Sequence, residues 1–188
     1  MASNKTEIKF NTKKLDSLLT YLKSLDDYYV KVGIIGSKAK AEHKNTNLTN
    51  AELGAIHEFG KGYQPQRSFL EMPLKMKFNF NTNQNLKELK KKSFNLLFVK
   101  RKPREFFNAL GQVAHDIIIG AFETNGYGAW KPWSKAYETR RINQVKGKRK
   151  RQEFWLNHNI LTLTGQLRRS IAFKVMKKKW YNQQKITY

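Results

Sequence analysis

The stretch TNAELGAIHEFG at residues 49–60, followed after four residues by PQRSFL at residues 65–70, decides the fold of this chain. Thr49 and Glu52 form a capping box, which predicts that a helix begins there. Gly60 ends that helix because glycine tolerates a positive φ, and the proline that opens the second stretch favours an extended exit. We therefore expect a short helix, a tight turn and an extended arm.

The predicted helix and arm carry residues suited to contacts. Leu53, Ile56 and Phe59 share one helix face at helical spacing. Arg67 of the arm could pair with Glu58 of the helix and pin the two together, bridge to a neighbouring subunit, or form an exposed pair that contributes little. The arm also carries two apolar residues, Phe69 and Leu70.

Upstream of this stretch, the pattern predicts a helix and a strand. Residues 16–25 favour a helix with a leucine stripe, made of Leu15, Leu18, Leu19, Leu22 and Leu25. Residues 28–35 are rich in β-branched and aromatic side chains, which predicts a strand. Residues 7–14 could form a further strand or a loose arm, and residues 37–48 are expected to be a polar loop.

Downstream, residues 104–123 predict the longest helix, which starts after Pro103. Its apolar residues cover more than one stripe, so we expect burial on two sides, with Gly111 marking a close contact. Residues 73–80 alternate apolar and polar side chains like a half-buried strand. Residues 86–99 predict a basic amphipathic helix.

The last third of the chain contains a tryptophan corner and an ordered apolar block. The corner is AWKPWS at residues 129–134, and the block is ILTLTGQLRRSI at residues 160–171. Thr164 is expected to cap a short helix, in which Leu167 and Ile171 face inward at i, i+4 spacing. The Trp-x-Pro context is typical of a packed corner, although Trp130, Trp133 and Trp155 could also stack on bases.

These patterns together predict one α+β domain over residues 1–188. Its small antiparallel sheet would be covered on one face by the long helix 104–123 and the shorter helix 15–25. Residues 170–176 and 186–188 could be closing strands of that sheet.

The order of the two signatures resembles the tail-completion (virion-morphogenesis, neck) proteins of tailed bacteriophages. The shared pattern is A-x-L-x-x-I-H-E-F-G, then P-x-R-x-F-L, then W-x-P with a later Thr139, a basic stretch and I-L-x-x-T-G-x-L-x-x-S-I. The resemblance covers residues 28–72 and 104–173, and it makes residues 75–103 an enlarged basic connection. The chain departs from the family pattern at four positions, Gly54, Gln66, Ser68 and Trp133.

The resemblance implies a structural role. Such a subunit forms a homo-oligomeric ring, most often a hexamer, at the head–tail junction, where it caps the tail and joins it to the head connector. Its partners would be other neck, connector and tail-tube proteins, and its location the virion neck after assembly in the host cytoplasm. The candidate subunit-interface residues are His57, Glu58, Phe59, Arg67, Phe69, Leu70, Trp130 and Trp133.

The charge points to a polyanion as a second possible partner. The chain has 37 basic and 14 acidic residues, a net charge of +23, with net +9 in residues 75–104 and net +14 in residues 130–188. Such a field attracts nucleic acid, although many lysines can also simply solvate a surface. The candidate residues facing DNA in the ring lumen are Lys146, Lys148, Arg149, Lys150 and Arg151. The alternative function is therefore a nucleic-acid-binding protein without sequence preference.

Catalytic, metal and cofactor sites are not expected. His57-Glu58 begins like a zinc motif, but Lys61 stands where the second histidine is needed. His115-Asp116 has no nucleophile beside it in the sequence, and no phosphate-binding glycine loop appears. The chain lacks cysteine and has no run near the ~18 apolar residues of a membrane span, so we expect no membrane partner.

Overall fold

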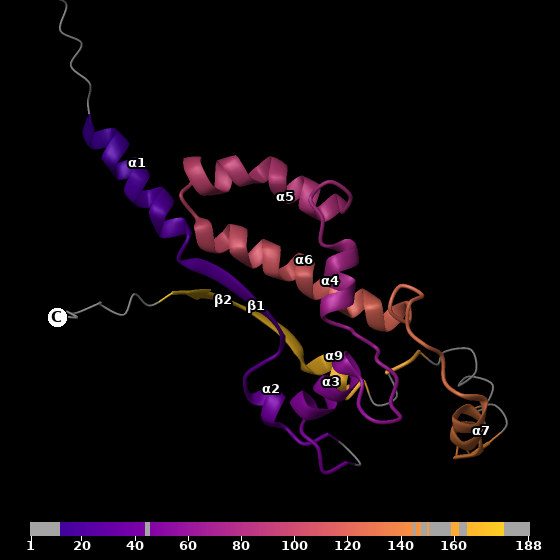
Figure 1. Cartoon of the computed structure of the whole chain (residues 1–188). Coiled ribbons are helices and arrows are strands. Elements are labelled where there is room, and N and C mark those ends of the chain that lie inside the picture. Colours follow the sequence, from indigo (N-terminus) through magenta and orange to yellow (C-terminus); the bar gives the residue numbers. More distant parts are fainter. Residues whose placement is uncertain are drawn as a thin grey trace, which may run out of the picture.

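The computed structural model describes residues 12–43, 46–144, 146–147, 150, 159–161 and 165–178 (Figure 1). The elements in chain order are α1 (Thr12–Leu25), β1 (Tyr28–Ile34), α2 (Ser37–Lys40), α3 (Asn50–Phe59), α4 (Glu71–Lys77), α5 (Gln84–Phe94), the π-helical segment η1 (Asn95–Val99), α6 (Pro103–Glu123), α7 (Lys135–Gln144), α9 (Gln166–Ser170) and β2 (Ile171–Lys177). This confirms the predicted α+β fold with a small antiparallel sheet against a long helix.

The sheet joins segments from opposite ends of the chain. β1 and β2 are antiparallel, with Tyr28 opposite Lys177 and Ile34 opposite Ile171. Because side chains alternate between the two faces of a strand, one face of the pair meets α6. There a Cβ built on Gly111 would lie 2.3 Å from the ring of Phe173, so the predicted close contact at this glycine is confirmed.

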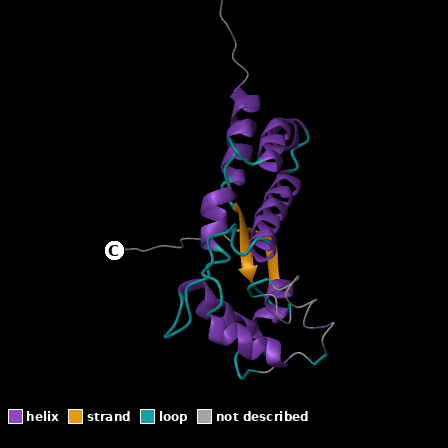
Figure 2. Ribbon diagram, turned by 90° about the vertical axis from the view of Figure 1, so that its right-hand side faces the viewer, coloured by secondary structure: helices purple, strands orange, loops and turns teal. Residues whose placement is uncertain are grey.

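Helix α6 is buried on two sides, as expected. Pro103 occupies its first turn, where a missing backbone N–H costs nothing. One side packs on the sheet and on the main core, whose buried members include Phe69, Ile118, Phe122, Trp130, Leu167 and Ile171. The other side packs Val113 and Ile117 against Leu86 of α5. Figure 2 shows helices at both ends of the two strands, so the molecule is elongated.

Helix α1 does not cover the sheet, and that prediction was wrong. It extends past the end of the sheet (Figure 1), and Leu15, Leu18 and Leu19 remain 49%, 38% and 47% exposed. Helix α1 contacts the rest of the molecule near its C-terminal end. There the Tyr21 hydroxyl donates to the carbonyl of Leu97, and the Arg101 guanidinium lies 5.5 Å from the centre of the Tyr21 ring. A leucine stripe defines an apolar face but not the surface that it meets.

Residues 73–80 were predicted as a strand and form α4 and a turn instead. Two acceptors meet the free N–H groups at the helix start: Glu58 of α3 accepts from the Glu71 N–H, and the nearby Ser68 Oγ accepts from the Met72 N–H. The predicted basic helix is confirmed as α5 and η1, with the Asn83 side chain accepting from the Leu86 N–H at its start.

Several predictions fall outside the described residues. These are the arm at residues 7–11, the Thr164 cap, the strand at 186–188, Trp155, and the basic residues Lys148, Arg149 and Arg151. Residues 12–14 belong to α1, and Lys146 and Lys150 are exposed. In the described part of the chain, no helix is both long enough and apolar enough to cross a membrane.

Candidate functional site

Helix α3 begins and ends where the sequence indicates. Thr49 Oγ1 accepts from the Glu52 N–H at 3.2 Å, and Glu52 Oε2 accepts from the Thr49 N–H at 2.8 Å. On the face shared by Leu53, Ile56 and Phe59, the first two side chains are half-buried and Phe59 is 70% exposed. The buried residues of α3 are Asn50, Gly54 and Glu58. Gly54 sits there because a Cβ would lie 2.4 Å from Ile34, so the small and polar side of the helix meets the core.

The carboxylate of Glu58 fastens the arm to α3. It is 5% exposed and accepts four hydrogen bonds, each between 2.7 and 2.9 Å. Oε1 accepts from Ser68 Oγ and the Glu71 N–H, and Oε2 accepts from the Phe69 and Leu70 N–H groups. Every strong acceptor position is therefore used, which is what burial of a carboxylate requires.

Arg67 joins the arm to the tryptophan corner rather than to Glu58, so the predicted ion pair is wrong. Its Nε donates to the Lys131 carbonyl at 3.0 Å and its Nη2 to the Pro132 carbonyl at 3.5 Å. The indole N–H of Trp130 donates to the Ser68 carbonyl at 2.8 Å. The first signature and the tryptophan corner of the second are thus hydrogen-bonded to each other.

Four predicted interface residues are buried, namely Glu58, Arg67, Phe69 and Trp130. Phe69 is fully buried, and its ring lies 5.3 Å from that of Phe122, which in turn meets Trp130 edge-on at 5.7 Å. Phe69, Trp130 and the buried Glu58 therefore hold the chain together and offer no side-chain surface to a neighbour. Leu70 is half-buried against the core. Phe59 is left as an exposed candidate.

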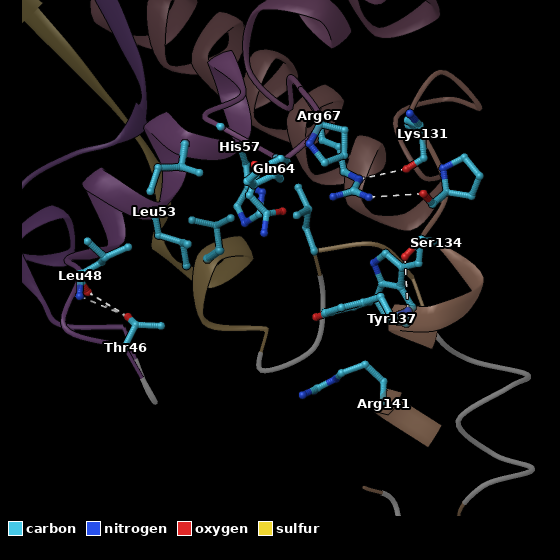
Figure 3. Close-up of a pocket in the computed structure, with 18 of the residues that line it drawn as sticks. Thr46, Leu48, Leu53, His57, Gln64, Arg67, Lys131, Ser134, Tyr137 and Arg141 are labelled. Carbon is cyan, nitrogen blue, oxygen red and sulfur yellow. Dashed lines mark hydrogen bonds between the residues drawn. The ribbon is translucent and has the colours of Figure 1, made fainter. Parts of the chain in front are cut away.

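A cavity of about 850 Å³ lies between α3, the tryptophan corner and α7 (Figure 3). Its apolar wall includes Leu53, Ile56, Trp133, Leu161 and Leu167. Its polar lining includes His57, Arg67, Tyr137 and Arg141. Trp133 and Tyr137 meet edge-on at 5.4 Å. The apolar face of α3 thus contributes Leu53 and Ile56 to the wall of this cavity.

The cavity is cationic. The described residues that line it include Arg67, Lys131 and Arg141 but no aspartate or glutamate. Burial lowers the pKa of the Arg67 guanidinium below its ordinary value, and nearby Tyr137 opposes this. Burial, the charge of Arg67 and then His43 lower the pKa of His57 to about 4. His57 is therefore a neutral imidazole at pH 7.

Two polar atoms of this lining have no partner. Among side-chain atoms of the described residues, His57 Nδ1 and Arg141 Nε are buried and make no hydrogen bond. Most buried polar atoms in proteins are paired, so their shared position in one cavity indicates an unused binding capacity. The sequence singled out His57 but missed Arg141 and Tyr137, because a polar helix after a tryptophan corner gives no signal of what it faces.

No group of three or more His, Cys, Asp or Glu side chains suited to a metal ion occurs in the described part of the chain. His115 Nδ1 lies 3.4 Å from its neighbour Asp116 on the surface of α6.

Comparison of this chain with models of protein families, with curated proteins and with solved structures found no significant match.

Proposed function

We propose that this chain is a structural virion protein of a tailed bacteriophage, a neck or tail-completion subunit. Its copies would form a ring at the head–tail junction, cap the tail and join it to the head connector. The interlocking of the two signatures supports this most strongly. Glu58 holds the arm, and the arm holds the tryptophan corner through Arg67 and Trp130, so the residues that carry the resemblance form one structural unit.

Exposed apolar surface supports self-association. A closed ring uses head-to-tail contacts, so each subunit needs two different patches. The first patch, at the α1 end, consists of Leu15, Leu18, Leu19, Phe94, Phe98 and Val99. The second lies at the end of α3 and consists of Phe59 and Tyr63. Large exposed apolar groups of this kind mark interaction sites.

The basic segments fit a lumen through which DNA passes. Lys87, Lys90, Lys91 and Lys92 of α5 are exposed, and attraction to phosphate needs no base contacts. In a ring, Lys146 and Lys150 would add to this charge. The assembled protein would belong to the virion neck, after assembly in the host cytoplasm.

Light scattering on the purified chain tests the proposal. We expect a ring-sized species, and we expect the double variant L18S/L19S to fall apart into smaller species because the α1 patch loses its apolar contacts. The matched variant K13S/T20S alters two exposed residues elsewhere on α1 and should keep the ring. A wild-type chain that stays monomeric, and that never decorates isolated tails in electron micrographs, would overturn the proposal.

A second candidate function is nucleic-acid binding without sequence preference. Lys31 and Lys174 are exposed and directly opposite each other on the sheet, an arrangement that is unfavourable unless an anion is near. Binding to a short duplex should then weaken steeply with added salt, and K31Q/K174Q should reduce the slope. Absence of binding at low salt would remove this candidate and leave the ring untouched.

A further inference from the structure

We propose that the cavity between α3 and α7 binds a carboxylate that is carried on an apolar group. The cavity shares Tyr63 with the apolar patch at the end of α3, but the proposal does not depend on ring formation. The ligand chemistry is that of an acidic residue next to apolar residues in a peptide segment, or of a free acid with an apolar body.

Two arginine side chains, Arg67 and Arg141, bring positive charge to the cavity. Arg67 is 5% exposed, and its hydrogen bonds go to the neutral carbonyls of Lys131 and Pro132. Arg141 reaches the cavity from α7 (Figure 3) with its Nε unpaired. A buried cation without an anion is unfavourable, and guanidinium groups bind carboxylates through paired N–H donors. A carboxylate is therefore the group that complements the described residues of this lining.

Neutral donors extend the same surface. His57 Nδ1 has no partner, and the imidazole carries no charge at pH 7 because burial disfavours its protonated form. In the Nδ1–H tautomer it can donate one hydrogen bond. Tyr137 adds a phenol group to the lining. A carboxylate has room for several donors on its two oxygens, so these groups can act together.

The apolar wall decides what else the ligand carries. Leu53, Ile56, Leu161 and Trp133 line the same cavity as the charged groups. The volume of about 850 Å³ lies within the roughly 300–1,000 Å³ of sites for small organic ligands and far exceeds what a bare carboxylate needs. A ligand that fills it must bring apolar surface, which an inorganic anion does not.

The test uses the full chain and two peptides, acetyl-Leu-Glu-Leu-amide and acetyl-Leu-Gln-Leu-amide. Calorimetry should show binding of the glutamate peptide, and the glutamine peptide should bind roughly tenfold more weakly because a charge-assisted hydrogen bond is lost. The ¹H–¹⁵N signal of the Arg141 Nε–H, assigned by its loss in R141Q, should shift on binding. Inorganic phosphate should bind more weakly than the glutamate peptide.

Two variants separate the site from general charge. R141Q should weaken binding of the glutamate peptide by roughly tenfold. The fold should survive because Arg141 Nη1 donates to Gln144 Oε1 on the same helix, at 2.9 Å. K135Q removes the same charge from an exposed position of α7 and should bind like the wild type. Circular dichroism of both variants checks that α7 persists.

The outcomes are decisive in each direction. Equal binding of the two peptides, phosphate binding as tight as the glutamate peptide, an unaffected R141Q, or no binding of the peptides and of phenylacetate at millimolar concentration would each overturn the proposal. Phenylacetate serves as the free acid. Tighter binding of phenylacetate than of the peptide supports the site and identifies a small molecule as its ligand, and the reverse order supports the site and identifies a protein segment.

Discussion

Two neighbouring residues of α3, His57 and Glu58, differ in whether their buried polar atoms have hydrogen-bond partners. Glu58 is buried with four hydrogen bonds from Ser68 and the backbone of the arm. His57 points into the cavity, and its Nδ1 has no partner. The first is a polar group that the fold has fully satisfied, and the second is one that the fold has left open. Where a buried polar group serves structure its partners come from the chain, and where partners are missing the site can serve binding.

The same contrast separates the two arginines of the site. Arg67 is held by the carbonyls of the tryptophan corner, so it belongs to the structure as well as to the cavity. Arg141 makes a side-chain contact within α7 and leaves Nε unpaired in the cavity. Removing satisfied groups should therefore destabilise the chain, while removing Arg141 should affect binding instead.

Replacing Glu58 should produce the largest effect. In E58Q an amide NH₂ faces donors that now lack an acceptor, and buried unpaired groups are costly. We expect a loss of roughly 3 to 5 kcal/mol in the free energy of unfolding, measured by urea denaturation.

The control for E58Q is a carboxylate at the surface. Glu123 pairs with Arg168 in an exposed ion pair, so E123Q should lose less than about 1 kcal/mol. If E58Q and E123Q were equally stable, the arm would not depend on the Glu58 carboxylate, and the contrast with His57 would fail.

The pH dependence of stability should come next in size. Burial lowers the pKa of His57 to about 4 from 6.5, so below pH 6.5 the unfolded chain binds a proton that the folded chain does not. Stability from this group should therefore fall as the pH is lowered from 6.5 to 4, by roughly 2 to 3 kcal/mol. Urea denaturation of wild type and H57Q at pH 7 and pH 4.5 measures it, and H57Q should lack this part of the dependence. Identical pH dependence in both proteins would contradict it.

Replacing Arg141 should have the smallest effect on stability. R141M removes an unpaired buried Nε and keeps apolar volume at the cavity wall, so we expect a change within about 1 kcal/mol in either direction. Thermal unfolding compared with wild type checks this. A loss as large as that of E58Q would show that Arg141 has structural partners and is no open donor.

Local patterns predicted most of the fold. The capping box at Thr49, the start of α6 at Pro103 and the close contact at Gly111 depend on residues near in sequence or on the absence of a side chain, and the sequence displays these directly. The strands β1 and β2 also follow from their β-branched and aromatic residues.

The remaining features depend on distant partners. Helix α4 stands where a strand was predicted, and Glu58 of α3 supplies an acceptor to the Glu71 N–H at its start. Glu58 binds backbone N–H groups rather than Arg67, a choice that charge pairing in sequence cannot show. The cavity combines His57 with Arg141, far apart in the chain, so the sequence indicated one side of the candidate site but not the other.

The assembly state tests the central proposal most directly. Native mass spectrometry of the unmodified chain should show a discrete species whose mass is a whole-number multiple of 22.1 kDa, with six copies the expected number. A single species of one subunit at every concentration, with or without isolated tails, would contradict the assignment of this chain as a ring-forming neck protein.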